Sequence, residues 1–367
     1  MHIVQMTSAH PRTDVRVFHK QCRSLAKAGA QVTLVVADDK GDDTVDGVTI
    51  VDVGRSEGRL KRMAASAYRV YRKARTLKAD AYHCHDPELI PWALRLKEQG
   101  APVIFDAHED LPAQIATKHY IPRYARRGLA AVVAMGERWA FPKFDGLVGA
   151  TSQIASQLAE LNGNVELVAN YPLKDEFEPP VDRTPRHALF VGSISRIRGV
   201  GEVVDAMSMV KEGRRFRLVG PMANDGIEQR VEESPGRSRT DVVGSVDRQA
   251  VAEEMASAVC GIVTFLEAPN HVCAQPNKLF EYMSAGIPIV ASNFTLWREI
   301  VEGTGCGLCV DPSRPEEVAS AIDRLFDDPI EAAKMGARGR EAVANRLNWE
   351  AQADNLLGFY RKLGILA

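Results

Sequence analysis

The amino-acid sequence predicts an α/β protein built from two doubly wound, Rossmann-like domains. Short β-branched runs alternate with longer amphipathic stretches almost from end to end, which is typical of parallel sheets covered by helices. A charged segment with three prolines, residues 174–187, interrupts this alternation and has the composition of an interdomain linker. We therefore expect domains at 1–173 and 188–348. The amphipathic end of the chain, 349–367, is expected to form a helix that crosses back to the first domain.

The expected strands are short and rich in β-branched residues. In the first domain they are Ile3–Met6, Val32–Ala37, Val48–Val51, Ala81–His83, Val103–Phe105 and Gly146–Gly149. In the second domain they are Ala188–Val191, Arg217–Val219, Val242–Gly244, Gly261–Phe265, Ile287–Ala291 and Leu308–Val310. Between the first two strands, Val17–Ala28 has the apolar spacing of a helix, and Gly29 is expected to end it.

Composition excludes several classes of protein. With 45% hydrophobic and 26% charged residues among 367, the chain is typical of folded globular proteins and unlike disordered ones. No apolar run reaches the roughly 18 to 20 residues that cross a bilayer, and the first residues lack a charged leader. The six cysteines are scattered, which favours reduced thiols. We therefore expect a cytoplasmic protein.

The formal net charge of −2 conceals an asymmetry between the two halves. Residues 1–173 carry 23 Lys/Arg against 19 Asp/Glu, and the remainder carries 23 against 29. Because no global basic field results, a nucleic-acid partner is not expected. Much of the basic excess lies in Arg59–Lys78, a basic amphipathic helix without an acidic residue.

A second basic patch precedes the apolar stretch Leu129–Met135; its members are Lys118, Arg123, Arg126 and Arg127. Two interpretations stay open for these patches. They can be solvated helix faces, or they can contact an anionic membrane, here the inner face of the plasma membrane, or a lipid-phosphate acceptor.

Several nucleotide and metal motifs are absent. The first strand is followed by the polar segment Thr7–Asp14 instead of Gly-x-Gly-x-x-Gly, which disfavours a nicotinamide oxidoreductase. There is no P-loop, no Gly-x-Ser-x-Gly and no Asp-x-Asp pair for a divalent ion, so we expect no metal and no cofactor.

The loop after the first strand lies at the carboxyl edge of the sheet, where ligands bind. The candidate acceptor residues are His10, Arg12, Asp14, Arg16 and Glu109. For Asp14 and Arg16 the alternative is a local salt bridge. The group His83, Cys84, His85 and Asp86 resembles a metal site by composition, but neighbours along a strand point to opposite faces, which favours a loop or helix-cap role.

One segment of the second domain, Pro276–Pro288, places polar side chains at a helix start. Pro276 marks the start and Gly286 the end, and the free N–H groups at the start of a helix after a parallel strand suit a diphosphate. Glu281 can accept hydrogen bonds from both hydroxyls of a ribose, or it can simply stabilise the helix dipole. Lys278 can reach a phosphate or pair with Glu281.

The segment Pro276–Pro288 resembles the nucleotide-sugar signature of the family 4 (group 1) glycosyltransferases. Further resemblances to that family lie in Leu189–Gly192, Arg196–Gly199, Arg217–Gly220, Val242–Val246, Phe105–Glu109 and Ala169–Asn170. The resemblance spans nearly the whole chain. It implies the GT-B architecture, in which two Rossmann-like domains face a central cleft, and transfer of a sugar from a nucleotide diphosphate with retention of configuration.

The resemblance also implies roles for individual residues. His108 would face the donor sugar, Arg198 would neutralise the diphosphate, and Glu281 would bind the ribose. The remaining donor-site residues would be Gly192, Ser193, Arg196, Gly220, Val246, Cys273, Gln275, Asn277 and Lys278. The alternative for His108 and Glu109 is a helix-capping pair.

Two positions depart from the family pattern. Cys273 stands where relatives have the first glutamate of Glu-x7-Glu, and Ser193 stands where many have arginine. Arg196 or Lys278 could supply the missing charge, and the backbone of Gln275–Asn277 could hold the sugar.

The leading hypothesis is a retaining, metal-independent glycosyltransferase that acts on a glycan or lipid-linked acceptor in bacterial polysaccharide or glycoconjugate synthesis. The alternatives are a nucleotide-sugar 2-epimerase of the same architecture and a catalytically idle nucleotide-sugar-binding protein.

Overall fold

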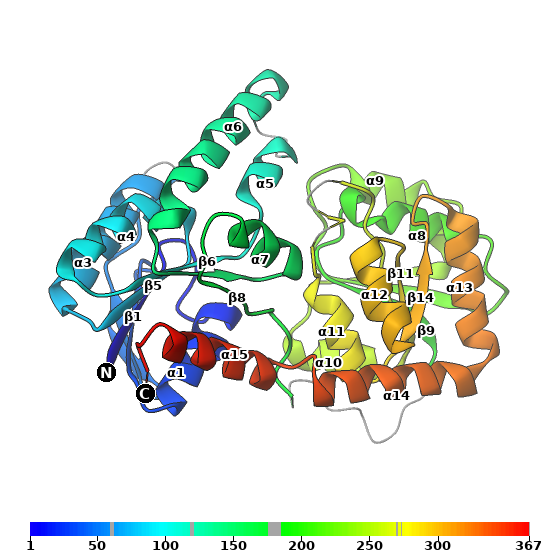
Figure 1. The fold of residues 1–367 in the computed structure, drawn as a ribbon. Coiled ribbons are helices and arrows are strands. Elements are labelled where there is room, and N and C mark those ends of the chain that lie inside the picture. Colours follow the sequence, from blue (N-terminus) through cyan, green and yellow to red (C-terminus); the bar gives the residue numbers. More distant parts are fainter. Residues whose placement is uncertain (59–61, 118–120, 175–184, 269–270, 273, 367) are drawn as a thin grey trace. The chain divides into compact units, whose positions relative to one another are not determined.

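The computed structural model of the chain describes residues 1–58, 62–117, 121–174, 185–268, 271–272 and 274–366. The chain divides into two compact units (Figure 1). Unit 1 comprises Met1–Asn170 together with Trp349–Ala367, and unit 2 comprises Tyr171–Asn348. Most of the expected linker, residues 175–184, lies outside the described residues. The C-terminal helix α15 (Trp349–Lys362) belongs to unit 1, so its predicted return to the first domain is confirmed.

Unit 1 is built around an eight-stranded sheet in the order β3-β4-β2-β1-β5-β6-β7-β8. The strands are β1 (His2–Met6), β2 (Gln31–Val36), β3 (Asp43–Val45), β4 (Val48–Asp52), β5 (Ala81–Cys84), β6 (Val103–Ala107), β7 (Gly146–Gly149) and β8 (Val165–Leu167). All neighbours pair in parallel except β3, which is antiparallel to β4. The sequence prediction lacked the short strands β3 and β8. The strand order reverses between β1 and β5, and such switch points bind ligands in open α/β sheets.

Helices cover both faces of this sheet. They are α1 (Arg23–Lys27), α3 (Ala67–Leu77), α4 (Ile90–Leu96), α5 (Leu111–Thr117), α6 (Arg123–Ala140), α7 (Ser152–Ala159) and α15. The helical segment between β1 and β2 begins as a π-helix over Val15–Cys22 and continues as α1. Gly29, at φ 88°, follows the end of α1. The predicted buried face of this segment is correct, since Phe18, Cys22 and Leu25 are buried.

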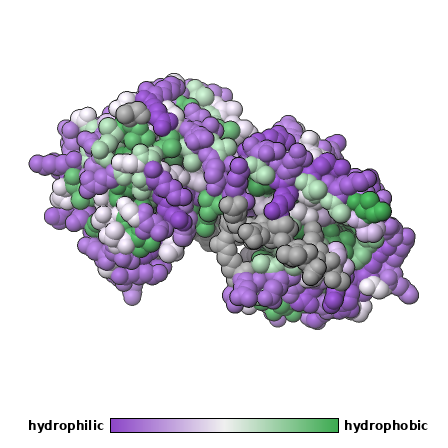
Figure 2. Space-filling view, turned by 90° about the horizontal axis from the view of Figure 1, so that it is seen from below, coloured by the Kyte–Doolittle hydropathy of each residue, from purple (hydrophilic) through white to green (hydrophobic). Residues whose placement is uncertain are grey.

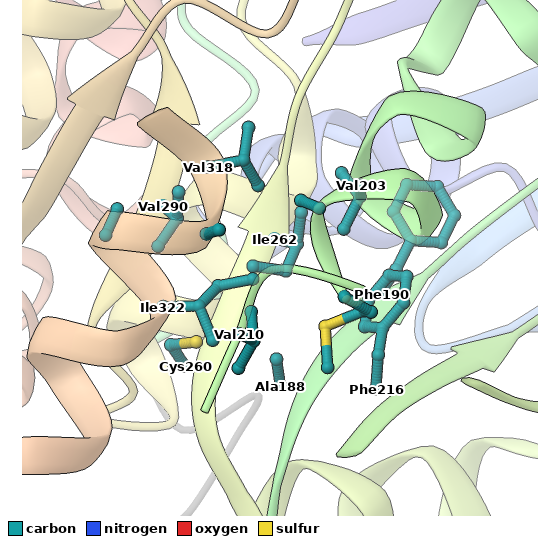
Figure 3. Close-up of a cluster of buried hydrophobic side chains, with 14 of the residues drawn as sticks. Ala188, Phe190, Val203, Val210, Phe216, Cys260, Ile262, Val290, Val318 and Ile322 are labelled. Atoms are coloured by element: carbon teal, nitrogen blue, oxygen red, sulfur yellow. The ribbon is translucent and has the colours of Figure 1, made fainter. Parts of the chain in front are cut away.

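Unit 2 contains a six-stranded, all-parallel sheet in the order β11-β10-β9-β12-β13-β14. The strands are β9 (His187–Val191), β10 (Arg215–Val219), β11 (Thr240–Gly244), β12 (Ala258–Val263), β13 (Ile289–Ser292) and β14 (Gly307–Val310). The helices are α8 (Val200–Ala206), α9 (Ile227–Glu232), α10 (Arg248–Ala256), α11 (Asn277–Ser284), α12 (Thr295–Thr304), α13 (Pro315–Asp327) and α14 (Pro329–Asn345). Side chains such as Phe190, Phe216 and Ile262 fill the core on one face of the sheet (Figure 3).

The face drawn in Figure 2 is largely hydrophilic, with apolar residues showing between the hydrophilic ones. Among the described residues, no helix combines the length and the apolar character needed to cross a membrane.

The ends of β9 and β10 come together through two glycines. Gly220 has φ 138°, and a Cβ atom at this position would lie 1.9 Å from the carbonyl oxygen of Gly192. Because this contact is with rigid backbone, any side chain at 220 would push the loop after β9 away from the sheet.

We expect Gly220→Ala to lower the stability of unit 2 by at least about 2 kcal/mol, since it combines strain at positive φ with a backbone clash. Thermal unfolding followed by calorimetry measures the loss. Gly303→Ala is the matched control, because a Cβ atom there meets nothing within 4 Å. Equal melting temperatures for the two variants would contradict the close packing of this loop.

Candidate functional site

The strand order of unit 2 reverses between β9 and β12, and the loops that follow these two strands touch. The backbone N–H of Leu266 donates to the carbonyl of Ile197 at 2.9 Å. Gly199, at φ 65°, comes so close to β12 that a Cβ atom would lie 2.7 Å from the carbonyl oxygen of Thr264. The glycine loop predicted from the sequence therefore sits at the switch point of the sheet.

Arg198 presents a half-buried cation in this loop. Its guanidinium lies 5.2 Å from the centre of the Phe265 ring, and burial lowers its pKa. Within the described part of the chain no carboxylate lies within ion-pair distance of it. A desolvated guanidinium without a carboxylate partner is suited to bind an anion.

Helix α11 starts beside the same loops. Pro276 is extended and precedes the first helical residue, and Gly286 follows the end at φ 67°. Lys278 and Glu281 form an ion pair across one turn, and both side chains are largely buried. Of the two alternatives for Lys278, the structure shows the pairing with Glu281, and a phosphate would have to compete with Glu281 for the ammonium group.

The other predicted donor residues lie near these loops but differ in exposure. Ser193, Arg196 and Asn277 are exposed, whereas Gln275 and Val246 are partly buried. Arg196 donates from its side chain to the carbonyl of Gly226 at 3.3 Å. Cys273 lies outside the described residues.

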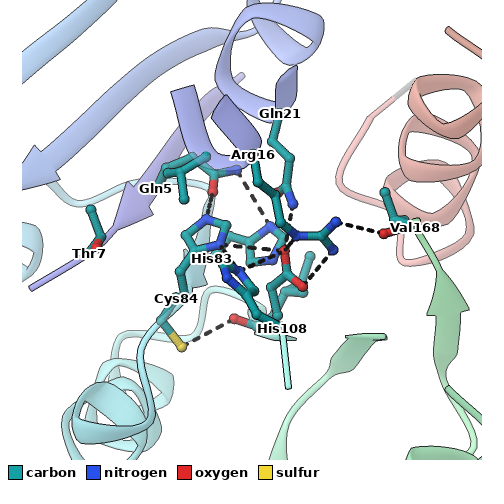
Figure 4. Close-up of polar contacts among 12 residues, drawn as sticks. Gln5, Thr7, Arg16, Gln21, His83, Cys84, His108 and Val168 are labelled. Atoms are coloured by element: carbon teal, nitrogen blue, oxygen red, sulfur yellow. Dashed lines mark hydrogen bonds and ion pairs between the residues drawn. The ribbon is translucent and has the colours of Figure 1, made fainter. Parts of the chain in front are cut away.

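A buried polar cluster organises the switch point of unit 1 (Figure 4). Its centre is the Asp106 carboxylate at the end of β6, which accepts two hydrogen bonds from Arg16, at 2.9 and 2.8 Å. Gln21 also donates to it, and His85 and His108 each place a ring nitrogen 3.4 Å from it. Burial alone would raise the pKa of Asp106, but Arg16 and His108 outweigh burial and hold the pKa well below its usual value.

Three predicted acceptor residues are used within the fold. Arg12 is buried and paired with Asp38 at 2.8 Å, and Arg16 is paired with Asp106. The Asp14 carboxylate caps the first helical segment by accepting from the Val17 N–H at 2.8 Å. The acceptor role predicted for Arg12 and Arg16 is not supported, because each guanidinium is already paired with a carboxylate inside unit 1; the salt bridge of Arg16 is with the distant Asp106 and is therefore not the local one left open as the alternative.

The group His83–Asp86 is also internal. His83 and His85 are two residues apart, share one face of the sheet and stack at 4.8 Å, so the argument from alternation failed for this pair. With Asp106 they bring possible ligand atoms within 4.8 Å of one another. A cation would have to compete there with Arg16, which already binds the carboxylate.

Asp86 joins the loops after β1 and β5. Its carboxylate accepts hydrogen bonds from the Thr7 hydroxyl at 2.7 Å and the Ser8 N–H at 2.6 Å, and it pairs with His10 at 2.9 Å. The hydrogen bond with Asp86 raises the pKa of His10. This contact is what brings His10 to the rim of a cavity.

The cavity, of about 450 Å³, opens within unit 1 beyond the ends of β5 and β6. Its lining includes His10, His85, Asp86, His108, Glu109 and Glu137. The capping-pair alternative for His108 and Glu109 is wrong, because Asp110 caps α5 by accepting from the Ala113 N–H at 2.9 Å. His108 and exposed Glu109 are thus left to face the cavity.

Glu137 on α6 was not predicted. Burial, and secondarily the charge of Asp110, raise its pKa to about 7. No hydrogen bond to its carboxyl group is found among the described residues. The signal in the sequence is faint: Glu137 is the one acidic residue in an otherwise basic and apolar helix, and nothing local shows which face it occupies.

Comparison with known proteins identifies the family. The model described as "Glycosyl transferase 4-like domain" matches residues 15–171, and the model "Glycosyl transferases group 1" matches residues 185–328. The chain belongs to the group 1 glycosyltransferases. The site region of unit 2 lies inside the second match, and that of unit 1 lies inside the first match except for the loop that follows β1.

Curated relatives of this glycosyltransferase are distant. The chain is 25% identical over 182 residues to α-D-kanosaminyltransferase of Streptomyces kanamyceticus, which covers 48% of this chain and 46% of that protein. It is 23% identical to the MMP α-(1→4)-mannosyltransferase of Mycolicibacterium hassiacum, with 73% of this chain and 67% of that protein covered. The chain thus spans less than half of the first relative and about two thirds of the second.

Solved structures confirm the GT-B fold. Sucrose-phosphate synthase of Thermosynechococcus elongatus superimposes with a TM-score of 0.79 at 20% identity, covering 100% of both chains. Anabaena HepE in complex with UDP and glucose gives a TM-score of 0.72 at 13% identity, covering 99% of this chain and 100% of that one.

We expect Glu137→Gln to stabilise the glycosyltransferase at pH 8 and to have little effect at pH 4.5. The pKa of Glu137 is raised in the folded state, so stability is lost as the pH rises from about 4.5 through 7, where the folded protein must ionise a carboxyl group that burial disfavours. Melting temperatures at the two pH values test this. Glu160→Gln, at an exposed position in the same unit, should show no such difference.

Proposed function

We propose that this glycosyltransferase moves a sugar from a nucleotide-diphosphate donor bound by unit 2 to a glycan or lipid-linked acceptor bound by unit 1. The observation that supports this most is Arg198, a half-buried cation without a carboxylate partner among the described residues. It stands at a sheet switch point where the loops after β9 and β12 meet. An anionic ligand at this point would restore the missing charge balance.

The roles of the donor residues follow from their chemistry. As the sugar leaves, negative charge grows on the diphosphate, and a planar guanidinium fixed by packing on Phe265 can stabilise that charge with two parallel hydrogen bonds. Glu281 would accept the ribose hydroxyls, and Lys278 would turn from Glu281 toward phosphate when the donor binds. Protein groups alone can supply this stabilisation, which is why we propose transfer without a metal.

Unit 1 supplies the acceptor side of the proposal. The cavity offers carboxyl groups, among them Glu109 and Glu137, that can accept hydrogen bonds from sugar hydroxyls, and His108 stands at its edge. His108 keeps its orientation through His85, whose Nδ1 lies 3.2 Å from the His108 Nε2. We propose that His108 contacts the donor sugar and that the reaction retains configuration, in the context of bacterial polysaccharide or glycoconjugate synthesis in the cytoplasm.

A surface contact through Arg59–Lys78 would be mainly electrostatic. Residues 59–61 lie outside the described part, and in α3 the apolar side chains Val70, Tyr71 and Ala74 are buried in the core of unit 1. The arginine and lysine side chains that remain outside can attract an anionic membrane, and of the large apolar side chains only Met63 and Tyr68 in the described part of this segment are exposed, at 42% and 43%. We propose no nucleic-acid partner.

The donor proposal is tested by thermal shift with UDP-, GDP- and dTDP-sugars. We expect at least one to raise the melting temperature, because a ligand that binds only the folded state stabilises it by RT ln(1 + [L]/Kd). Arg198→Met and Glu281→Ala should each weaken that shift, with roughly 10- to 100-fold higher Kd for the lost charge-assisted contacts.

Glu302→Gln is the control, since Glu302 pairs with the exposed Arg298 on α12 and lies outside the proposed site. If Arg198→Met binds every nucleotide sugar as the parent does, the proposed role of Arg198 is wrong. A new sugar isomer formed from the donor alone, detected by NMR, would identify a 2-epimerase instead. Donor binding without transfer to any member of a broad glycan panel would favour an idle binding protein.

A further inference from the structure

Helix α6 (Arg123–Ala140) exposes an unusual number of large apolar side chains. Tyr124 is 90% exposed, Val132 60%, Met135 65% and Trp139 62%. In Figure 1 this helix extends beyond the sheet of unit 1, next to α5. Exposed apolar side chains that are contiguous mark an interaction surface rather than random exposure.

Four of the exposed apolar residues share one side of the helix, and Leu129, which is 43% exposed, lies beyond the edge of that side. At about 100° per residue, Tyr124, Val132, Met135 and Trp139 fall within an arc of roughly 80°. Glu137 lies on the opposite side and lines the cavity of unit 1. The helix therefore uses one face for the fold and leaves a continuous apolar face unpartnered within the described residues.

The same exposed side carries positive charge. Arg127 and Arg138 are exposed, and both project to one edge of the apolar arc. Lys143, just after the helix, places its Nζ 3.1 Å from the centre of the Trp139 ring. From 123 to 143 the sequence has five arginine or lysine residues and one acidic residue, Glu137, which lies on the other face.

This combination distinguishes α6 from the other basic helix. In α3 the side chains of Val70, Tyr71 and Ala74 are buried in the core of unit 1 and Tyr68 is 43% exposed, whereas four large apolar side chains of α6 are at least 60% exposed. An exposed apolar face with a tryptophan, edged by arginine and lysine, matches the surface of an anionic bilayer, because the apolar groups enter the acyl boundary while the cations meet lipid phosphates.

We infer that the exposed face of α6 is the site at which this protein binds an anionic membrane surface. The apolar arc lies in the headgroup and acyl boundary, and Arg127, Arg138 and Lys143 contact the lipid phosphates. This inference goes beyond the proposed sugar transfer and does not depend on which donor or acceptor is used.

The test uses the full chain with sucrose-loaded vesicles of phosphatidylcholine alone and of phosphatidylcholine with phosphatidylglycerol at equal amounts. We expect binding in sedimentation only to the anionic vesicles, with weakening at high salt. Val132→Ser/Met135→Ser should lower the partition coefficient about tenfold or more. Arg127→Gln/Arg138→Gln should lower it roughly 10- to 30-fold, as two basic contacts of about 1 kcal/mol each imply.

Ile330→Ser is the matched control, because Ile330 is an apolar side chain in unit 2 that is 69% exposed. It should leave the partition coefficient unchanged.

Trp139 is the most exposed tryptophan, since Trp297 and Trp349 are buried and Trp92 is partly buried. A blue shift of the fluorescence on adding anionic vesicles should therefore disappear in Trp139→Phe.

Three results would overturn the inference. One is no binding to anionic vesicles; a second is binding that survives both α6 double variants but is lost in Arg72→Gln/Lys73→Gln on α3. A third is a parent protein that self-associates in ultracentrifugation through a contact removed by Val132→Ser/Met135→Ser, which would make this face a contact between copies. Melting temperatures with nucleotide sugars are measured in parallel, so that a failure of lipid binding is separate from a failure of the proposed transferase function.

Discussion

The buried charge of Asp106 is the constraint on which unit 1 depends. A fully buried carboxylate is tolerated only when cations and donors satisfy it, and here the partners come from separate elements: Arg16 and Gln21 from the first helical segment and His85 from the end of β5. The network continues through His83, whose Nδ1 lies 2.7 Å from the hydroxyl of Tyr360 on α15. This polar network joins segments that are far apart in the sequence. Its contact with Tyr360 is one of several that attach the C-terminal helix to unit 1, beside the buried side chains of Leu356 and Phe359.

This network also fixes what is available for chemistry. Arg16 is bound within the fold, because two of its nitrogens donate to Asp106 and the third donates to the carbonyl of Val168 at 2.8 Å. The partly exposed members of the network at the cavity are His10 and His108. Each is paired with a buried carboxylate, His10 with Asp86 and His108 with Asp106. Unit 2 differs from unit 1 in the surroundings of its site cation. Its glycine loop packs Arg198 against the Phe265 ring, and in the described part of the chain no carboxylate pairs with this cation. The first unit therefore presents preoriented polar groups and the second a cation packed on an aromatic ring.

The alternation of strands and helices was enough to predict the fold, because each parallel strand is buried on both faces and reads as a short apolar run. Strands β3 and β8 were missed because neither contains a buried residue, so no apolar run marks them. The pairing of Arg16 with Asp106 could not be predicted either, since 90 residues separate them and only the sheet order brings them together. Glu137 was not predicted for a related reason: its environment depends on α5 and not on the sequence of its own helix, α6.

Charge counting showed the limit of sequence reasoning most clearly. The sequence marks two basic, amphipathic segments in the first half, and by composition alone the stronger candidate for a membrane is Arg59–Lys78, with more cations and no acid. The fold reverses that order. A helix can contact a bilayer through apolar side chains only if the protein core does not already use them. In α3 most of the apolar side chains are buried and Tyr68 is exposed, whereas α6 exposes four large apolar side chains on one side. Which amphipathic face is free is a property of the tertiary structure, so the same pattern of residues encodes a core helix in one place and a surface for a partner in the other.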